Sequence, residues 1–195
     1  CIDSRTGHIL AMVGGSEFNS RTNWFNRAAY AKVQPGSAFK PLYYSAAIEE
    51  GKITPATMLI DAPVIFWNDD GTPYTPLNYK GRWNGRVLSR YALAKSLNIP
   101  SLKILHEIGF DSAIDQAAWM LGITDPQEIE YNFPRKYPLG LGIIRVSPFQ
   151  MVKAYATFPN EGREVIPIGI RFIEDRYGKK ILEPEKELIA RQKRL

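Results

Sequence analysis

The chain has 195 residues, 45% of them hydrophobic and 23% charged, which suits one folded domain with a core. Its net charge of +5 is spread along the sequence without a basic and aromatic stripe, so we expect no nucleic-acid partner. A single cysteine excludes an internal disulfide, and no apolar run reaches the roughly 18 residues of a membrane span. The chain opens at Cys1 in what reads as a strand, so we expect a longer parent chain.

Turn and strand signals in residues 1–15 predict an opening β-hairpin. Gly7 suits the turn, residues 8–13 read as a strand, and two glycines close it. Residues 16–36 are polar and irregular. A helix is predicted from Ser37 to Glu50, because apolar residues then recur at spacings of three and four: Phe39, Leu42, Tyr43, Ala46 and Ala47.

The remaining sequence predicts a helical block and a second hairpin. Residues 54–86 are rich in Pro, Gly, Asn and Asp and read as a long loop. Helices are predicted at residues 87–96, 101–108, 112–121 and 148–158, with a break at Asn98-Ile99-Pro100, an N-cap at Asp111 for the third and at Ser147 for the fourth. Residues 166–173 and 180–182 flank a turn and predict a hairpin. This order of elements predicts an α+β fold.

The chain contains one Ser-x-x-Lys motif, formed by Ser37 and Lys40. Pro35 and Gly36 precede the serine, so it lies where a loop becomes a helix, and the lysine follows one turn later on the same face. A serine hydroxyl becomes a good nucleophile when a neighbouring base takes its proton, and a lysine can be that base when burial lowers its pKa. Taken alone, the pair is better interpreted as a helix cap and a surface lysine.

The chain also contains one Ser-x-Asn motif, formed by Ser96 and Asn98 at the predicted break between two helices. A serine there can relay a proton to a leaving amine, and an asparagine amide can hold a substrate amide. Alone, the triplet reads as an ordinary helix stop before Pro100.

Together the two motifs resemble the signature of penicillin-binding proteins and serine β-lactamases. The resemblance is to the transpeptidase domain of class A penicillin-binding proteins and extends from Asp3 to about Leu182. The segments that carry it are residues 25–28 (Phe-Asn-Arg-Ala), 34–41 (Gln-Pro-Gly-Ser-Ala-Phe-Lys-Pro), 61–63 (Asp-Ala-Pro), 76–79 (Pro-Leu-Asn-Tyr), 91–100 (Tyr-Ala-Leu-Ala-Lys-Ser-Leu-Asn-Ile-Pro), 139–140 (Leu-Gly), 146–148 (Val-Ser-Pro) and 154–158 (Ala-Tyr-Ala-Thr-Phe).

The resemblance implies a site and an architecture. Ser37 would attack the carbonyl between two terminal D-alanines of a peptidoglycan stem peptide, and Lys40 would accept its proton. Ser96 would pass a proton to the leaving D-alanine, while Asn98 would hold the peptide amide. β-Lactams would acylate Ser37 as substrate mimics, and no cofactor is implied. We divide this partial domain into an opening hairpin of a central antiparallel sheet, a nucleophile helix, a helical subdomain with long loops and a peripheral hairpin: residues 1–15, 37–50, 54–160 and 163–183.

The chain departs from the family pattern because it holds no Lys-Thr-Gly motif. Arg5-Thr6-Gly7 precedes the nucleophile and matches the opening turn instead. We expect the third motif, on core strands outside this chain, to supply an oxyanion donor and the carboxylate-binding groups, so residues 1–195 alone should be acylated poorly. The resemblance also implies an upstream glycosyltransferase domain and a membrane anchor in the parent, on the periplasmic side of the cytoplasmic membrane.

Two alternative functions stay open at the sequence level. The first is a serine β-lactamase, since Glu128 and Asn132 have the spacing of a deacylation loop. The second is a non-catalytic, transpeptidase-like binding module. No metal site is expected, because His8 and His106 lack Cys or acidic partners at ligand spacing. For the aromatic residues of the 54–86 loop we expect packing rather than a substrate groove: Trp67, Tyr74, Tyr79 and Trp83.

Overall fold

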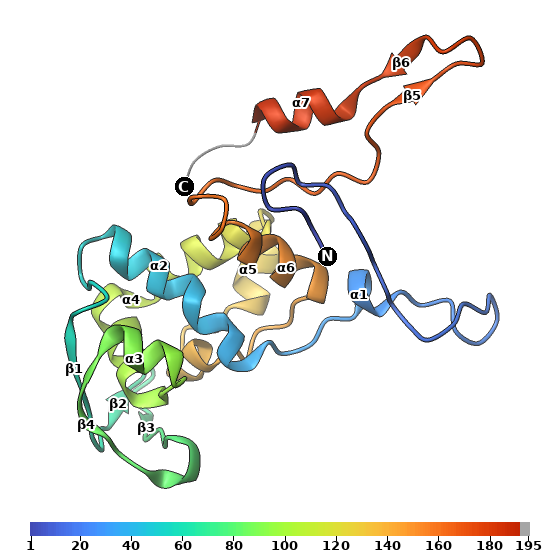
Figure 1. Ribbon diagram of the computed structural model, residues 1–195. Helices are drawn as coiled ribbons and strands as arrows, with labels where there is room; N and C mark the ends of the chain where they lie inside the picture. Colours follow the sequence, from blue (N-terminus) through green and yellow to red (C-terminus); the bar gives the residue numbers. More distant parts are fainter. Residues whose placement is uncertain (192–195) are drawn as a thin grey trace. The chain divides into compact units, whose positions relative to one another are not determined.

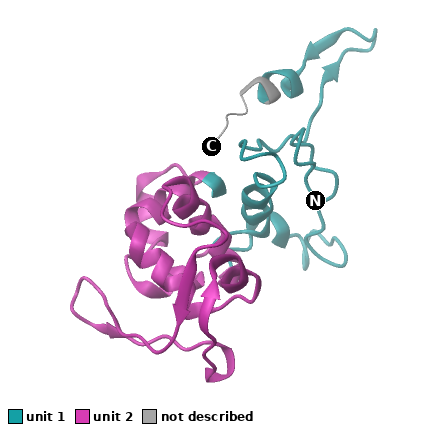
Figure 2. Ribbon diagram, turned by 60° about the vertical axis from the view of Figure 1, so that its left-hand side comes forward, with its two compact units in different colours: residues 1–33, 120–122, 146–195 teal, residues 34–119, 123–145 magenta. Residues whose placement is uncertain are grey.

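The computed structural model describes residues 1–191 and divides into two compact units (Figures 1 and 2). Unit 1 comprises residues 1–33, 120–122 and the chain from Val146 onward, and unit 2 comprises residues 34–119 and 123–145. Helices and short antiparallel strands both occur, so the predicted α+β class is confirmed. Among the described residues, no helix combines the length and apolar character needed to cross a membrane.

Unit 2 is built on helix α2 (Lys40–Glu49), which follows a 3-10 turn, η1 (Gly36–Phe39). The predicted apolar face is confirmed, because five side chains at three- and four-residue spacing are all buried: Phe39, Leu42, Tyr43, Ala46 and Ala47. Gly51, two residues after the last residue of α2, has a positive φ of 69°, as expected of a glycine that follows a helix. The core face of α2 therefore follows from its sequence period.

The 54–86 segment is more regular than its composition indicates. Strand β1 (Met58–Asp61) pairs antiparallel with β4 (Gly85–Leu88), and β2 (Phe66–Trp67) pairs with β3 (Pro73–Tyr74). A short 3-10 turn, η2 (Tyr79–Gly81), lies between β3 and β4. The prediction of a loop was wrong here, because the pairing of β1 with β4, whose partners run from Met58 and Leu88 to Asp61 and Gly85, outweighs the local turn signals.

The two helices after β4 also begin elsewhere than predicted. Helix α3 (Ser89–Ala94) starts two residues later than expected, since Val87 and Leu88 belong to β4. Helix α4 (Asn98–Leu121) includes Asn98 and continues past Gly109, where a φ of 79° interrupts the helical backbone. Pro100 does not break the helix, because proline is tolerated in a first turn whose N–H groups have no intrahelical partner.

The rest of unit 2 consists of two short helices that the sequence analysis did not identify. Helix α5 (Pro126–Asn132) is capped by the Asp125 carboxylate, which accepts a hydrogen bond from Gln127 N. The 3-10 turn η3 (Tyr137–Leu141) ends at Gly142. Residues of η3 pack against α2, where the Tyr43 hydroxyl donates to Gly140 O at 3.3 Å.

Unit 1 contains two helices packed together, α1 (Arg27–Tyr30) and α6 (Pro148–Ala156). The predicted Ser147 cap of α6 is confirmed and forms a full capping box with Gln150. Helix α6 ends two residues before the predicted end. The predicted second hairpin is present as β5 (Ile173–Glu174) and β6 (Lys180–Leu182), with a shorter first arm than expected, and α7 (Pro184–Arg191) follows.

The opening hairpin of residues 1–15 is short, and backbone hydrogen bonds join its arms only between residues 1–3 and 8–11. One antiparallel bridge joins Ile2 to Ile9, and one parallel bridge joins His8 to Ile168. Leu10 and Val13, in the predicted second strand, are 63% and 80% exposed. The prediction of a continuous strand was therefore wrong, since a two-stranded hairpin without a covered apolar face is marginal in water.

Candidate active site

Ser37 lies in the 3-10 turn that leads into α2, and its side chain is exposed. Residues three apart eclipse one another in a 3-10 turn, so this geometry places Ser37 and Lys40 on the same side of the helix entry. The backbone N–H of Lys40 donates to Ser37 O, which closes the turn. The loop before the serine is held by a hydrogen bond from Gly36 N to Gly142 O at 3.2 Å.

Lys40 is completely buried, with 0% of its side chain surface exposed. Its Nζ donates to Asn98 Oδ1 and Ser96 O, each at 2.8 Å, to Ser96 Oγ at 3.2 Å and to Leu97 O at 3.3 Å. Burial lowers the pKa of Lys40 from 10.5 to about 8, because the protein interior disfavours the charged form. The lysine is therefore within reach of neutrality near physiological pH.

The Ser96–Asn98 turn between α3 and α4 surrounds the lysine. Ser96 has a φ of 54°, in the left-handed region that non-glycine residues rarely adopt. This conformation turns its carbonyl and hydroxyl toward Lys40 Nζ. The Leu97 carbonyl that faces Lys40 also accepts from Ser101 Oγ at 2.6 Å, and this hydroxyl lies 2.8 Å from the Tyr44 hydroxyl on α2.

The amide of Asn98 bridges two parts of unit 2. Its Oδ1 accepts from Lys40, and its Nδ2 donates to Leu77 O at 2.8 Å. An asparagine amide has two donor hydrogens and two acceptor lone pairs, so one of each stays available for a substrate. The structure thus brings Lys40, Ser96 and Asn98 into direct contact, with Ser37 one turn before Lys40.

A buried polar network behind this site was missed as a functional feature. Asp61, 0% exposed, accepts hydrogen bonds from Asn78 and Asn84, and Asn78 in turn binds the start of α4. The sequence does contain a signal for this network. The segments Asp-Ala-Pro at 61–63 and Pro-Leu-Asn-Tyr at 76–79 carry the family resemblance, but the resemblance alone assigns no role to Asp61 or Asn78.

The aromatic residues of the 54–86 segment do not form a packed cluster. Trp67 is 63% exposed, Tyr79 is 85% exposed and Trp83 is 48% exposed, so the expectation of packing was wrong for these three. Each lies in or beside a two-residue strand or a short turn, which buries little side-chain surface on its outer face. Tyr74 is partly buried, and its burial raises the pKa of its hydroxyl.

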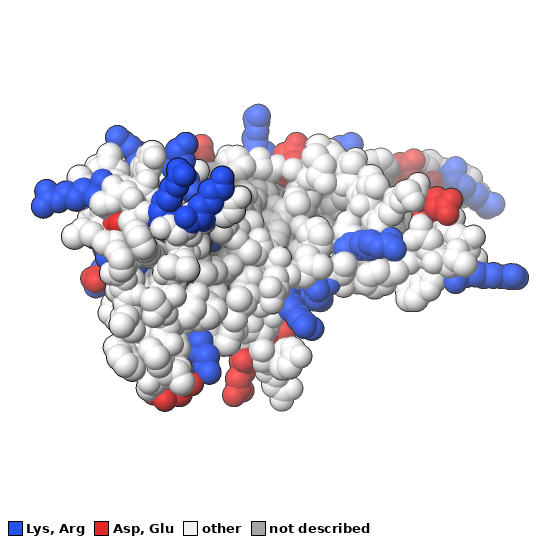
Figure 3. All heavy atoms as spheres, turned by 90° about the horizontal axis from the view of Figure 1, so that it is seen from below, with Lys and Arg blue, Asp and Glu red and all other residues white. Residues whose placement is uncertain are grey.

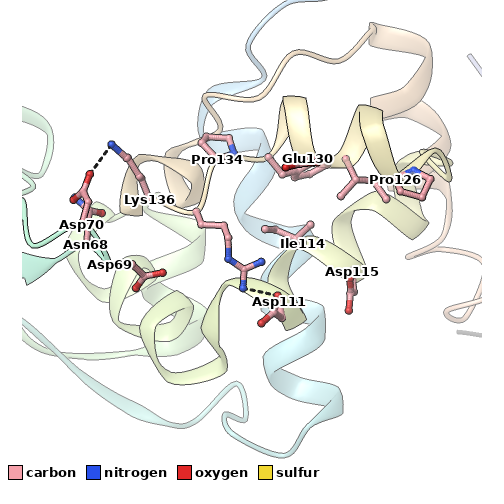
Figure 4. Close-up of a pocket in the computed structure, with 13 residues that line it drawn as sticks. Asn68, Asp69, Asp70, Asp111, Ile114, Asp115, Pro126, Glu130, Pro134 and Lys136 are labelled. Atoms are coloured by element: carbon pink, nitrogen blue, oxygen red, sulfur yellow. Dashed lines mark hydrogen bonds and ion pairs between the residues drawn. The ribbon is translucent and has the colours of Figure 1, made fainter.

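A separate cavity of about 700 Å³ in unit 2 is lined by acidic and basic side chains (Figure 4). Arg135 pairs with Asp111 at 2.5 Å, and Lys136 pairs with Asp70 at 2.9 Å. Hydrogen bonds to the Asp70 carboxylate lower its pKa to about 2; the bond from the Thr72 hydroxyl has the largest effect and the bond from Lys136 the next largest. None of the four predicted site residues lines this cavity.

The Glu128 and Asn132 pair lies on α5, and neither residue lines that cavity or donates to or accepts from Lys40. The Asn132 amide is used twice by the backbone of Arg145, whose O accepts at 2.9 Å and whose N donates at 2.7 Å. This is a structural role for Asn132 in holding the 132–145 segment. On the face shown in Figure 3, Lys and Arg side chains stand singly or in small groups.

A serine at a helix entry, a buried lysine one turn later and a Ser-x-Asn turn in contact with that lysine match the motif set of penicillin-binding proteins and serine β-lactamases. The family model "Penicillin binding protein transpeptidase domain" matches residues 1–193. The chain therefore belongs to the penicillin-binding protein transpeptidase domain family.

Individual relatives agree with this assignment. The chain is 38% identical over 180 residues to penicillin-binding protein 1A of Neisseria gonorrhoeae, covering 91% of the chain and 21% of that protein. Against penicillin-binding protein 1A of Pseudomonas aeruginosa, identity is 36% over 178 residues, again 91% of the chain and 21% of the relative. The crystal structure of penicillin-binding protein 1A from Haemophilus influenzae has a TM-score of 0.80 and 31% identity, covering 93% of this chain and 26% of that one. The chain thus spans about a fifth of the length of these curated relatives.

Proposed function

We propose that this chain carries the nucleophile and the proton-transfer groups of a penicillin-binding D,D-transpeptidase. The observation that carries the proposal is the buried Lys40, which contacts Ser96 Oγ and Asn98 Oδ1 one helical turn after the exposed Ser37. A base of lowered pKa beside a serine nucleophile is what acyl transfer requires.

In the proposed reaction, neutral Lys40 takes the proton of the Ser37 hydroxyl while the Ser37 oxygen attacks the carbonyl between the two terminal D-alanines of a stem peptide. Ser96 gives its hydroxyl proton to the nitrogen of the leaving D-alanine as the peptide bond breaks, and protonated Lys40, which donates to Ser96 Oγ, replaces that proton. An amine of a second stem peptide then attacks the Ser37 ester, forms the cross-link and returns the serine hydroxyl. The free donor and acceptor of Asn98 hold the amide of the stem peptide.

The same site would be acylated by β-lactams, whose strained amide takes the place of the D-alanyl peptide. Stem peptides and β-lactams are therefore the proposed partners of the site. The length of the relatives supports a parent with further domains, for which we propose a glycosyltransferase domain and an anchor that hold the site at the outer face of the cytoplasmic membrane. Residues 1–195 contain no Lys-Thr-Gly triplet, so we expect them to be acylated slowly on their own.

The direct test is covalent labelling of the full-length protein with a reporter penicillin, followed by mass mapping of the adduct. We expect the adduct on Ser37 and none in Ser37→Ala. Ser45→Ala is the matched control, because Ser45 lies on α2 and its hydroxyl donates to Leu42 O within that helix. An adduct on another residue, or labelling that persists in Ser37→Ala, would reject the proposal, and no labelling at all would favour a non-catalytic module.

The lifetime of the adduct separates a transpeptidase from a β-lactamase. The acyl group of a penicillin target is expected to persist on the order of hours, whereas an efficient hydrolase releases its acyl group in well under one second, roughly. We expect the long lifetime, because Asn132 is occupied by backbone hydrogen bonds to Arg145.

A further inference from the structure

The Ser96–Asn98 turn is attached to a buried carboxylate through one asparagine side chain. Asn78, 6% exposed, accepts hydrogen bonds at its Oδ1 from Asn98 N at 2.8 Å and Ile99 N at 3.2 Å. The first N–H groups of a helix have no intrahelical partner, so they bind a nearby acceptor or water. In α4 this acceptor comes from a residue 20 positions earlier, so it ties the start of the helix to a different part of unit 2.

Asp61 and the start of α4 bind opposite ends of the Asn78 amide. The backbone N–H groups of Asn98 and Ile99 can only donate, and Asp61 Oδ1 accepts, so the amide presents its oxygen to α4 and its NH2 group to Asp61. The distances agree, with Asn78 Nδ2 at 2.6 Å from Asp61 Oδ1 and at 3.0 Å from Arg82 O. The second carboxylate oxygen accepts from Asn84 N at 2.9 Å and from Asn84 Nδ2 at 2.6 Å. Asp61 itself is the last residue of β1, which pairs with β4.

We propose that Asp61 and Asn78 are positioning residues for acyl transfer, holding the Ser96–Asn98 turn in the geometry that Lys40 requires. This inference rests on the proposed function, since it assigns a role in the reaction of the same site. In the described part of the chain, no hydrogen bond joins either side chain to Lys40 or Ser37, so both act through the start of α4.

Two features of the turn explain why it needs this support. All four oxygens that accept from Lys40 Nζ belong to residues 96–98, so a movement of the turn changes every one of these contacts. Ser96 also has a left-handed backbone, which persists only where the surrounding structure holds it in place. The hydrogen bonds of Asn78 lie two and three residues after Ser96, where they fix the end of the turn.

The first test compares Asn78→Ala with Asn68→Ala in the full-length protein. Asn68 is a matched control, because it is 9% exposed and its hydrogen bonds go to Thr72 and Tyr137 rather than to α4. The measurement is pre-steady-state acylation by a chromogenic β-lactam, which separates the maximal rate from the half-saturating concentration. We expect the maximal rate to fall by about 10-fold to about 100-fold in Asn78→Ala, the effect of misplacing a reacting group by about 1 Å. The half-saturating concentration should change by less than about 3-fold, because binding groups are retained.

The second test is an exchange of the two side chains. Asn78→Asp alone places two carboxylates against each other. Its maximal acylation rate should fall by at least as much as that of Asn78→Ala. The double variant Asp61→Asn with Asn78→Asp again pairs one amide donor with one carboxylate, which still accepts from the start of α4 but can no longer donate to Arg82 O. We expect its maximal rate to be higher than that of Asn78→Asp but lower than that of the wild type, because only one of the two donor contacts of Asn78 is replaced. The near-isosteric Asp61→Asn keeps the test informative if Asn78→Ala does not fold. Its maximal acylation rate should be lower than that of the wild type, and its melting temperature should change no more than that of Asn68→Ala.

The outcomes separate this inference from the proposed function. If Ser37→Ala still becomes labelled, the proposed function fails. If Ser37 is the labelled residue but Asn78→Ala and Asp61→Asn acylate as fast as Asn68→Ala, only the positioning role is overturned. Failure of the exchange to recover the rate, with both variants folded, also overturns it.

Discussion

The pH dependence of Ser37 acylation should report the neutral fraction of Lys40. Burial lowers the pKa of Lys40 to about 8, from an ordinary value of 10.5. At pH 7, about one-tenth of such lysines are neutral, compared with about one in 3,000 at the ordinary pKa. Burial thus increases the amount of available base by about 300-fold at pH 7.

The assay follows single-turnover acylation of the full-length protein by a chromogenic β-lactam between pH 6 and pH 9.5. If neutral Lys40 takes the Ser37 proton, the rate should rise by about 10-fold from pH 6 to pH 7, rise less steeply toward pH 8 and level off near pH 9. Lys40→Ala provides the control, since its residual rate should lack this rise. Spontaneous hydrolysis of the β-lactam at each pH is measured without protein and subtracted.

Two results would refute this reasoning in different ways. A rate that stays flat between pH 6 and pH 8 would show that Lys40 does not act as the proton acceptor. A rise that continues about 10-fold per pH unit up to pH 9.5, without levelling, would show that burial leaves the lysine with its ordinary pKa, although the side chain is fully enclosed.

Two further predictions concern the effect of burying Lys40 on folding stability and the left-handed backbone of Ser96. The unfolded chain keeps the Lys40 proton up to pH 10.5, whereas the folded chain releases it near pH 8, so folding stability should rise with pH through this window. Relative to Lys40→Met, the free energy of unfolding should increase by about 2.5 kcal/mol between pH 7 and pH 10, measured by urea unfolding; no difference between the two pH profiles would contradict it. For Ser96, the left-handed φ of 54° predicts that Ser96→Gly is more stable than Ser96→Ala by about 1 kcal/mol in thermal unfolding. Both variants should be acylated slowly because both lack the hydroxyl, and a fast Ser96→Gly would show that only the backbone of this residue matters.

Much of the site could be predicted because its elements are local in sequence. The 3.6-residue period of the apolar positions after Ser37 gives the buried face of α2, and Lys40 falls on that face. The Ser147 cap of α6 was likewise predictable, since a capping box depends on residues three apart. Local rules succeed where the partners of a side chain or backbone group lie within one helical turn.

The missed features depend on contacts between distant residues. Strands β1 and β4 pair across a gap rich in Pro, Gly and Asn, so turn signals hide them. The Asp61 and Asn78 network joins residues 17 positions apart and then reaches Asn98, 20 positions further on. No period or motif spacing predicts that a buried carboxylate orients an amide that caps a helix. The contact between Lys40 and the Ser-x-Asn turn could be inferred only from the family resemblance, because 56 residues separate Lys40 from Ser96.

Gly142 is a position where a single methyl group should test how closely the Ser37 loop must be held. A Cβ at Gly142 would lie 2.0 Å from Gly36 O and less than 3 Å from two more backbone atoms of Gly36, the residue directly before the nucleophile. Backbone atoms cannot turn aside as a flexible side chain can, so Gly142→Ala must displace this loop by about 1 Å to reach ordinary contact distances. Its hydrogen bond to Gly36 N would change as well.

The matched control is Gly51→Ala, which has a similar positive φ but no atom within 4 Å of its new Cβ. Both variants should lose about 1 kcal/mol of stability from the left-handed backbone, and Gly142→Ala should lose more because of the contact with Gly36. The maximal acylation rate should fall by up to about 100-fold in Gly142→Ala and stay near that of the wild type in Gly51→Ala. Equal acylation rates in the two folded variants would show that Ser37 tolerates a displaced loop, and the 3-10 turn at Gly36–Phe39 would then have no part in aligning the nucleophile with Lys40.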